Sequence, residues 1–250
     1  NRIRSENNEF LNKFISYSYD NQGNLLKVMD VRKNVTKHKF TYNNYNQLIK
    51  KENQDGTYEE YAYNENGALS FISKHECCAS NTCLQVTNIS LSYYGENRLK
   101  RYGDIVFTYN EEGIRISKKA NTLLHKYYVE GSTIHKEEII NLINNKVVDS
   151  IYYYYDAQGI TGFKYQGKFY IYLKDLTGNI IGIYNEYGKE VARYTYDAYG
   201  NHEVLDEYGI INNNATFIGN INPFRYKGYY YDVETGLYYC NSRYYNSKIY

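Results

Sequence analysis

A short unit built around tyrosine recurs through most of the chain and constrains its fold more than any other feature. In YTYDAYGN, residues 194–201, Tyr194 and Tyr196 are two positions apart, Asp197 follows, and Gly200 comes three residues later. Residues i and i+2 of a β-strand lie on one face, so both rings point to the same side. Asp or Asn opens a type I turn, and Gly at its fourth position adopts positive φ without steric cost. The unit therefore predicts a strand end, a turn and a new strand.

The spacing between copies of this unit is unequal. Tyr19, Tyr42 and Tyr63 are separated by 23 and 21 residues, whereas Tyr184 and Tyr196 are separated by only 12. This irregularity argues against leucine-rich and helical repeats, whose period is held nearly constant by stacking. We therefore predict an all-β fold of tandem irregular β-hairpins that form a curved or spiralling sheet. The complete units are Tyr19, Asp20 and Gly23; Tyr63, Asn64 and Gly67; Tyr109, Asn110 and Gly113; Tyr155, Asp156 and Gly159; Tyr184, Asn185 and Gly188; and Tyr196, Asp197 and Gly200.

Composition supports this fold and excludes several partners. The chain has 35 Tyr, nine Phe and no Trp, so much of its core must consist of rings whose hydroxyls need hydrogen-bond partners. Its 29 basic and 28 acidic residues are interspersed and give a net charge of +1, which leaves no basic patch for nucleic acid or an anionic membrane. No apolar run is long enough to span a membrane, and neither an initiating Met nor a signal-peptide region begins the sequence. We expect no nucleic-acid partner and no membrane insertion, and interpret the chain as a segment of a longer protein.

Residues 133–155 permit either a short helix or strands. Their content of Val, Ile and Tyr favours strands, and Asn144 with Asn145 separates the two halves. We predict a β-hairpin over these residues.

Three of the four cysteines lie in HECCASNTCLQ, residues 75–85, which we interpret as an irregular insertion between hairpins. Adjacent Cys77 and Cys78 fit the ligand spacing of zinc sites poorly, so we predict no metal. A disulfide from Cys77 or Cys78 to Cys83 is expected if the compartment is oxidising, and reduced packing thiols are the alternative. Cys240 either remains unpaired or pairs with the third cysteine of the insertion.

Catalytic motifs are scarce. The five histidines have unlike surroundings, and the sequence contains no nucleophile-elbow, zinc-protease or phosphate-loop motif. Adjacent carboxylates such as Glu137 and Glu138 point to opposite faces of a strand and cannot act together as acid and base. These observations predict no cofactor.

The segment NPFRYKGYYYDVETGLYYCNSRYY, residues 222–245, resembles the Rhs repeat-associated core motif, and the tandem tyrosine units before it resemble the YD repeats of the same proteins. That group includes bacterial Rhs polymorphic toxins, C components of insecticidal toxin complexes, and teneurins. We divide the chain into a hairpin array, residues 1–220, and a truncated core motif, residues 221–250. The positions that carry the motif are Asn222, Pro223, Phe224, Arg225, Tyr226, Gly228, Tyr231, Asp232, Glu234, Thr235, Gly236, Leu237, Arg243, Tyr244 and Tyr245.

The resemblance implies a hollow shell of β-hairpins that holds a C-terminal toxin domain. On this interpretation the chain is a structural encapsulation segment, forming wall and plug. Its partners are the toxin domain of the parent chain, the remaining shell segments and delivery proteins. The parent is then secreted or displayed on the surface of a bacterium of low GC content. The alternative from residues alone is a glycan- or wall-binding repeat protein, because rows of tyrosine can stack on sugars.

A third interpretation is an aspartyl autoprotease that releases the C-terminal domain, as the resemblance also implies. Asp232 is then one catalytic carboxylate and Arg225 its charge partner. The competing role for Asp232 is that of a turn residue, like Asp20 and Asp197. The second half of such a site falls beyond Tyr250, so we expect no enzymatic activity from these residues alone. Arg225 and Arg243 are expected to stack on tyrosines or to pair with Glu234.

Overall fold

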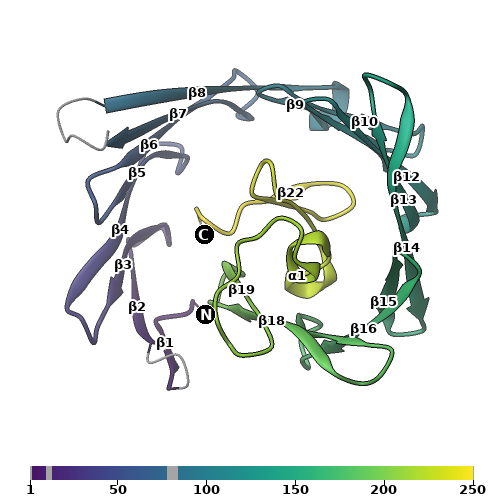
Figure 1. Ribbon diagram of the computed structural model, residues 1–250. Coiled ribbons are helices and arrows are strands. Elements are labelled where there is room, and N and C mark those ends of the chain that lie inside the picture. Colours follow the sequence, from purple (N-terminus) through teal and green to yellow (C-terminus); the bar gives the residue numbers. More distant parts are fainter. Residues whose placement is uncertain (1, 10–12, 78–83, 250) are drawn as a thin grey trace. The chain divides into compact units, whose positions relative to one another are not determined.

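The computed structural model describes residues 2–9, 13–77 and 84–249. These residues form two compact units, one of residues up to Ser92 together with Ile249, and one of residues Tyr93–Lys248. In both units antiparallel strands pair with their neighbours in sequence, nineteen strands in the main sheets in all (Figure 1). The predicted all-β fold is confirmed. The predicted division at residues 220 and 221 separates sequence motifs and stays a prediction.

The first unit is a meander of eight strands in which each pairs with the next. Buried residues gather on one face, as with Ile15 and Tyr17, which are two positions apart on one strand. The strands are β1 (Ser5–Asn8), β2 (Lys13–Tyr19), β3 (Leu25–Asp30), β4 (Val35–Tyr42), β5 (Leu48–Asn53), β6 (Tyr58–Tyr63), β7 (Leu69–Cys77) and β8 (Leu84–Tyr93), the last ending where the second unit begins.

The second unit begins with a 3₁₀ turn, η1 (Gly95–Asn97), and continues as a meander of eleven strands. Its buried face includes Phe163, Ile180 and Ile183, all fully buried. The strands are β9 (Leu99–Tyr102), β10 (Ile105–Tyr109), β11 (Arg115–Ala120), β12 (Leu123–Glu130), β13 (Thr133–Asn141), β14 (Lys146–Asp156), β15 (Gly159–Tyr165), β16 (Lys168–Lys174), β17 (Ile180–Asn185), β18 (Glu190–Tyr196) and β19 (His202–Leu205).

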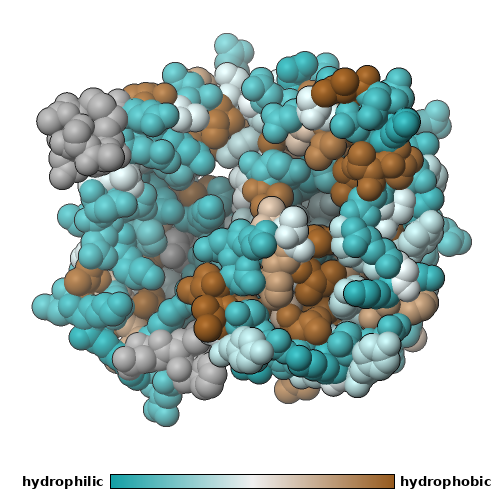
Figure 2. Space-filling view, viewed as in Figure 1, coloured by the Kyte–Doolittle hydropathy of each residue, from teal (hydrophilic) through white to brown (hydrophobic). Residues whose placement is uncertain are grey.

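Residues 218–245, the core segment, fold back against the buried face of this second meander. In Figure 1 the strands β10–β18 curve around α1 and β22. The segment comprises α1 (Ile218–Ile221), η2 (Tyr226–Gly228) and a small sheet of β20 (Tyr230–Asp232), β21 (Leu237–Tyr239) and β22 (Tyr244–Tyr245). Phe224, Tyr230 and Tyr239 join the hydrophobic core of the meander. On the face drawn in Figure 2, hydrophilic residues predominate and hydrophobic residues form separate patches.

The turn of the repeated unit forms as predicted. At Asn64 the side-chain oxygen accepts hydrogen bonds from the main-chain N–H groups of Asn66 (3.0 Å) and Ala68 (2.9 Å), and Gly67 has φ +77°. Asp156 also accepts the N–H group two residues later, that of Gln158 (2.8 Å), but it pairs directly with Gly159 in a tighter hairpin. The side chains that accept turn N–H groups in the same way are Asp20, Asn43, Asn110, Asp175, Asn185, Asp197 and Asp206.

In six units the second tyrosine donates to a main-chain carbonyl at or near the start of the preceding strand. The Tyr63 hydroxyl donates to the main-chain carbonyl of Leu48 (2.8 Å), at the start of β5. Phenylalanine has no such donor, which explains why tyrosine dominates these positions. The other hydroxyl-to-carbonyl bonds of this kind are Tyr19 to Ile3, Tyr42 to Leu25, Tyr109 to Leu99, Tyr155 to Ile134, and Tyr196 to Ile180, at 2.6–3.0 Å.

The predicted hairpin over residues 133–155 is confirmed as β13 and β14. Asn145 takes the left-handed conformation, with φ +54°. The predicted disulfide lies outside the described residues, since Cys78, Cys83 and the side chain of Cys77 are not among them. Cys240 is a half-buried free thiol.

Candidate functional site: a buried charge cluster under the core segment

Asp232, the last residue of β20, is fully buried against the meander of the second unit. Its main-chain carbonyl accepts the N–H groups of Thr235 (3.2 Å) and Gly236 (2.8 Å), so its backbone does form a turn. Its carboxylate does not cap that turn. Oδ2 accepts a hydrogen bond from Nη1 of Arg115, and Nζ of Lys118 lies 3.1 Å from Oδ1. Asp232 thus differs from the capping Asp20 and Asp197.

A β-bulge brings Arg115 and Lys118 to the same face of β11. Three positions apart on a regular strand, they would point to opposite sides. The register shifts here, because Tyr109 pairs with Arg115 while Thr108 pairs with Ser117. One extra residue in β11 reverses the alternation and aims both cations at the core segment. Lys118 also donates to Glu234 Oε2 (2.7 Å), which ties a second acidic residue of the core segment to the wall.

The guanidinium of Arg115 is enclosed by aromatic rings. Its central carbon lies 4.3 Å from the ring centroid of Tyr239, 4.8 Å from that of Tyr230 and 4.9 Å from that of Tyr127. Burial alone would lower the pKa of Arg115, but the Asp232 carboxylate and the surrounding tyrosines together outweigh burial and hold that pKa well above its ordinary value. Arg115 is therefore a permanent buried cation, stabilised by one carboxylate and by the faces of the rings.

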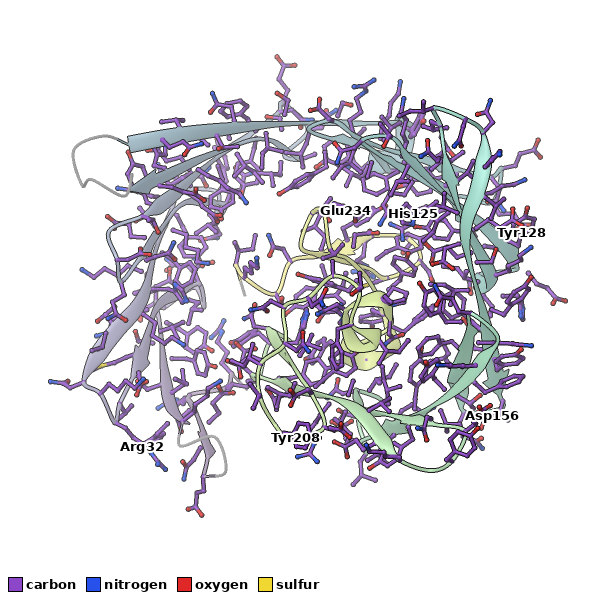
Figure 3. All side chains as sticks on the ribbon, viewed as in Figure 1. Arg32, His125, Tyr128, Asp156, Tyr208 and Glu234 are labelled. Carbon is purple, nitrogen blue, oxygen red and sulfur yellow. The ribbon has the colours of Figure 1, made fainter. Side chains whose placement is uncertain are left out.

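Glu137 of β13 is a second buried acid, 2 % exposed, at the centre of a polar network. It accepts hydrogen bonds from Tyr153 (2.8 Å) and from Tyr230 (2.9 and 3.0 Å), and Nδ1 of His125 lies 2.6 Å away. Burial alone would raise the pKa of Glu137, but His125, Lys118 and the Tyr153 hydroxyl outweigh it and lower the pKa to about 2. His125 also faces Glu234, at 3.7 Å (Figure 3). The network joins β12, β13 and β14 to the core segment.

A neutral anchor fixes the start of the core segment. Asn222 is fully buried and accepts a hydrogen bond from Tyr172 of β16 (2.5 Å). Its amide nitrogen donates to Tyr194 of β18 (3.0 Å), whose own hydroxyl donates to the main-chain carbonyl of Gly219 (2.6 Å). Both tyrosines thus satisfy their hydroxyls on the core segment rather than in water.

Comparison with known proteins covers both the hairpin array and the core segment. The family model of the teneurin YD-shell matches residues 4–250. The chain belongs to the teneurin YD-shell family.

Individual relatives of this YD-shell chain are much longer than it is. The tRNA3(Ser)-specific nuclease WapA of Bacillus spizizenii is 29% identical over 240 residues, which cover 83% of the chain and 10% of the relative. Teneurin-1 of Homo sapiens is 22% identical over 237 residues, covering 79% of the chain and 9% of the relative. The chain thus spans about a tenth of the length of these relatives. A crystal structure of TcdB2-TccC3 without its hypervariable C-terminal region aligns with a TM-score of 0.49 and 15% identity, over 95% of this chain and 15% of that one.

Arg225, the charge partner predicted for Asp232, has other contacts in the YD-shell structure. Its Nη1 donates to Nε2 of His202, and its guanidinium carbon lies 4.7 Å from the ring centroid of Tyr231. The expected stacking on tyrosine is therefore present, whereas the cations beside Asp232 and Glu234 are Arg115 and Lys118. Burial and the adjacent Arg225 lower the pKa of His202 to about 3, so this imidazole is neutral at pH 7.

Other residues of the core motif make hydrogen bonds or form turns within the core segment and to the meander. The Tyr244 hydroxyl lies 3.0 Å from that of Tyr109, which connects the core motif to a repeat tyrosine. Pro223 accepts the N–H of Tyr231 through its carbonyl, Arg243 accepts that of Cys240, and Gly228 and Gly236 have positive φ.

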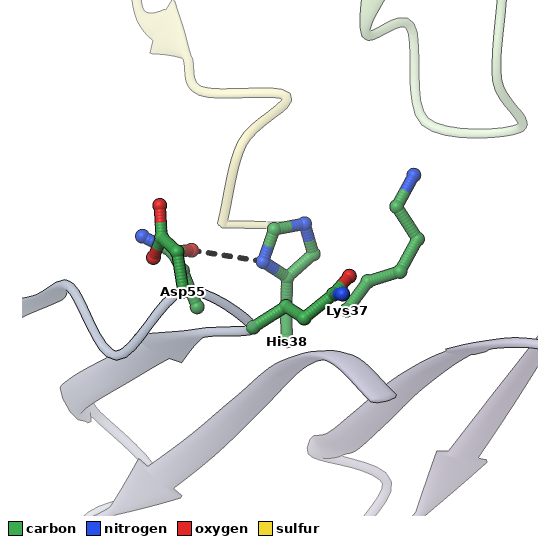
Figure 4. Close-up of a pocket in the computed structure, with 5 residues that line it drawn as sticks. Lys37, His38 and Asp55 are labelled. Atoms are coloured by element: carbon green, nitrogen blue, oxygen red, sulfur yellow. Dashed lines mark hydrogen bonds between the residues drawn. The ribbon is translucent and has the colours of Figure 1, made fainter. Parts of the chain in front are cut away.

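A pocket of about 360 Å³ occurs in the first unit, lined by Lys37, His38, Asn53, Gln54 and Asp55 (Figure 4). His38 Nδ1 lies 2.9 Å from Oδ1 of Asn53. Burial and the charge of Lys51 lower the pKa of His38 to about 4.

Two further observations concern ligands and membranes. Within residues 2–9, 13–77 and 84–249, His, Cys, Asp and Glu form no group of three or more that could hold a metal ion. Over the same residues no helix has the length and apolarity needed to cross a membrane. The buried charge cluster consists of Arg115, Lys118, Glu137, Asp232 and Glu234. Each acid in it contacts a cation or accepts hydrogen bonds from tyrosine hydroxyls, so the cluster has the geometry of an anchor.

Proposed function

We propose that this chain supplies part of the wall and the internal plug of a YD shell that encloses a C-terminal toxin domain of the same parent protein. The parent protein is secreted or displayed on a bacterial surface, and its other shell segments and delivery proteins are the remaining partners. Membership of the YD-shell family supports the shell role. The cargo is proposed from the WapA relatives, which are named as tRNA nucleases.

The observation that carries the proposal is the attachment of the core segment to the curved meander. Asp232 and Arg115 are 117 positions apart in sequence, and Tyr230 and Glu137 are 93 apart, yet both pairs are buried and hydrogen-bonded. Such contacts hold the core segment against the meander of the second unit. Without the core segment, this face of the meander would be exposed and apolar. In the proposed shell this segment closes the container beside its cargo.

The test uses the parent protein extended past residue 250, as wild type and with Asp232→Asn. Asp206→Asn is the matched control. Asp206 accepts turn N–H groups, and Asn64 accepts them in the equivalent turn of another unit, so asparagine should serve equally well at position 206. Limited proteolysis should spare the C-terminal domain in wild type and in the control, and digest it sooner in Asp232→Asn. Digestion of the wild-type C-terminal domain as fast as the same domain in isolation would overturn encapsulation.

The same samples distinguish anchoring from self-cleavage by Asp232. Mass spectrometry of untreated protein should give the same fragments for wild type and for Asp232→Asn if Asp232 is an anchor. Two fragments from wild type and one intact chain from Asp232→Asn would make Asp232 a catalytic carboxylate instead.

A further inference from the structure

The turn between β5 and β6 departs from the turn of the repeated unit. At Asn64 the first residue of the turn accepts main-chain N–H groups two and four positions later. The equivalent oxygen of Asn53 lies instead 2.9 Å from Nδ1 of His38, and the N–H of Thr57 is accepted by Asp55 (3.0 Å). The side chain of Asn53 therefore orients a residue of β4 rather than closing its own turn.

A β-bulge in β4 brings a lysine to the same place. Val28 pairs with His38 and Met29 with Thr36, so Lys37 is the extra residue of the bulge. On a regular strand Lys37 and His38 would point to opposite faces, whereas a bulge re-aims a side chain. Both residues line the pocket of the first unit.

The pocket holds opposite charges that do not pair with each other. In Figure 4 the Asp55 carboxylate and the Lys37 ammonium stand on opposite sides of the His38 ring. Oδ1 of Asp55 accepts hydrogen bonds from the Thr57 hydroxyl (2.6 Å) and main-chain N–H (3.0 Å), which fix the carboxylate and lower its pKa. Among the described residues, no hydrogen bond or ion pair involves Oδ2 of Asp55, the Lys37 ammonium or the Gln54 side-chain amide.

The ring between the two charges carries no charge of its own. Burial and the charge of Lys51 lower the pKa of His38 to about 4, so the imidazole is neutral at pH 7. The pocket, of about 360 Å³, is within the range of small-ligand sites. It thus presents one cation, one anion and one amide around an uncharged ring. A ligand that matches this set has a carboxylate at one end, an ammonium at the other and an amide between them.

We propose that this pocket binds a short zwitterionic peptide, a role beyond encapsulation. The C-terminal carboxylate of the peptide pairs with Lys37 and its N-terminal ammonium with Asp55. The Gln54 amide, which both donates and accepts, bonds to the peptide group between them. A single amino acid carries both charges on one carbon, whereas the charged ends of a dipeptide are separated by roughly 6–7 Å. Two charged groups on opposite sides of a ring therefore favour a dipeptide over a free amino acid.

The experiment measures binding of L-alanyl-L-alanine to the 250-residue chain by ligand-observed saturation-transfer NMR. The N-acetylated dipeptide lacks the ammonium, the dipeptide amide lacks the carboxylate, and the doubly blocked dipeptide resembles an internal stretch of a chain. Blocking either end should weaken binding about tenfold, or about 1.4 kcal/mol. Free alanine should also bind more weakly than the dipeptide. These ligands test the contacts on the unaltered protein.

Two variants test the same contacts from the side of the protein. Lys37→Met and Asp55→Asn should each weaken binding of the free dipeptide about tenfold. Asparagine at position 55 still accepts the N–H of Thr57, so the turn is retained. The matched controls are Lys39→Met, on the same strand but outside the pocket, and Asp206→Asn, in a turn of the second unit. Both controls should bind as wild type does, and circular dichroism checks that each variant is folded.

Four results would overturn the proposal. The first is that the free dipeptide does not bind. The second is that the doubly blocked dipeptide binds as tightly as the free one, which would indicate a site for internal main chain. The third is that free alanine binds as tightly as the dipeptide. The fourth is that Lys37→Met and Asp55→Asn both bind as tightly as wild type.

Discussion

Asp232→Asn should strongly destabilise the core segment, because it removes one negative charge from between two buried cations. Arg115 is fully buried and the Lys118 side chain is 3% exposed, so water cannot replace the lost carboxylate. Lys118 keeps Glu234, whereas the ion pair of Arg115 is lost. Removing one partner of a buried ion pair costs about 3–5 kcal/mol. That is a large fraction of the ~5–15 kcal/mol by which domains are usually stable.

Hydrogen exchange measured by mass spectrometry on peptides covering residues 230–239 provides the assay. Asp232→Asn should exchange there much faster than wild type, while peptides of the first unit are unchanged. Asp206→Asn, the same chemical change in a turn, should leave both regions as they are. The double variant Arg115→Met with Asp232→Leu should recover much of the loss, because it removes the charges together and keeps apolar volume.

The reasoning is refuted if Asp232→Asn exchanges at the wild-type rate over residues 230–239. It is also refuted if the double variant is less stable than Asp232→Asn alone, because the buried charge would then not be the source of the cost.

Three further results are expected from the repeat and from the core segment. Tyr63→Phe should lower the free energy of unfolding by ~1 kcal/mol in urea, since the bond to Leu48 is lost; no change would mean that water satisfies that carbonyl equally well. Gly200→Ala should lower the melting temperature more than Gly188→Ala does. Both glycines have positive φ, but a Cβ at position 200 would lie 2.6 Å from the Tyr226 ring, whereas one at position 188 would meet nothing within 4 Å. Equal costs would show that the ring yields freely. The pKa of His202 is lowered from 6.5 to about 3, so the protein takes up a proton when it unfolds between these pH values, and its stability should fall as the pH drops below about 6.5. His202→Gln should make the urea midpoint less dependent on pH in this range. An unchanged dependence would contradict the assignment.

Local features of the fold could be predicted because the responsible residues are adjacent in sequence. The turn at Asn64 depends on one side chain and on amides two and four residues later, all within a single unit. The hairpin of β13 and β14 follows from strand-forming residues on either side of Asn144 and Asn145. Such patterns are read without knowledge of any distant partner.

The charge cluster was missed because its members are brought together by long-range packing. Arg115 and Lys118 have helical or irregular spacing in sequence, and only the bulge in β11 puts them on one face. Adjacent Glu137 and Glu138 are expected on opposite faces of a strand, but the sequence does not indicate which of them faces inward, and the structure shows that Glu137 does. Arg225 is near Asp232 in sequence, whereas Arg115, the cation that contacts Asp232, is 117 positions away. The concentration of basic residues in β11, RISKKA, is the one signal in the sequence that points to the cluster.

The hydroxyl-to-carbonyl bonds between successive hairpins have an evolutionary consequence. Each donor and its acceptor belong to neighbouring units, as with Tyr42 and Leu25 or Tyr63 and Leu48. A duplicated hairpin therefore arrives with its own donor and offers an acceptor to the next, and a deleted one leaves its neighbours able to bond to each other. The number of hairpins is therefore not fixed by any single joint, and the array can be lengthened or shortened by whole hairpins without redesign of the bonds between them.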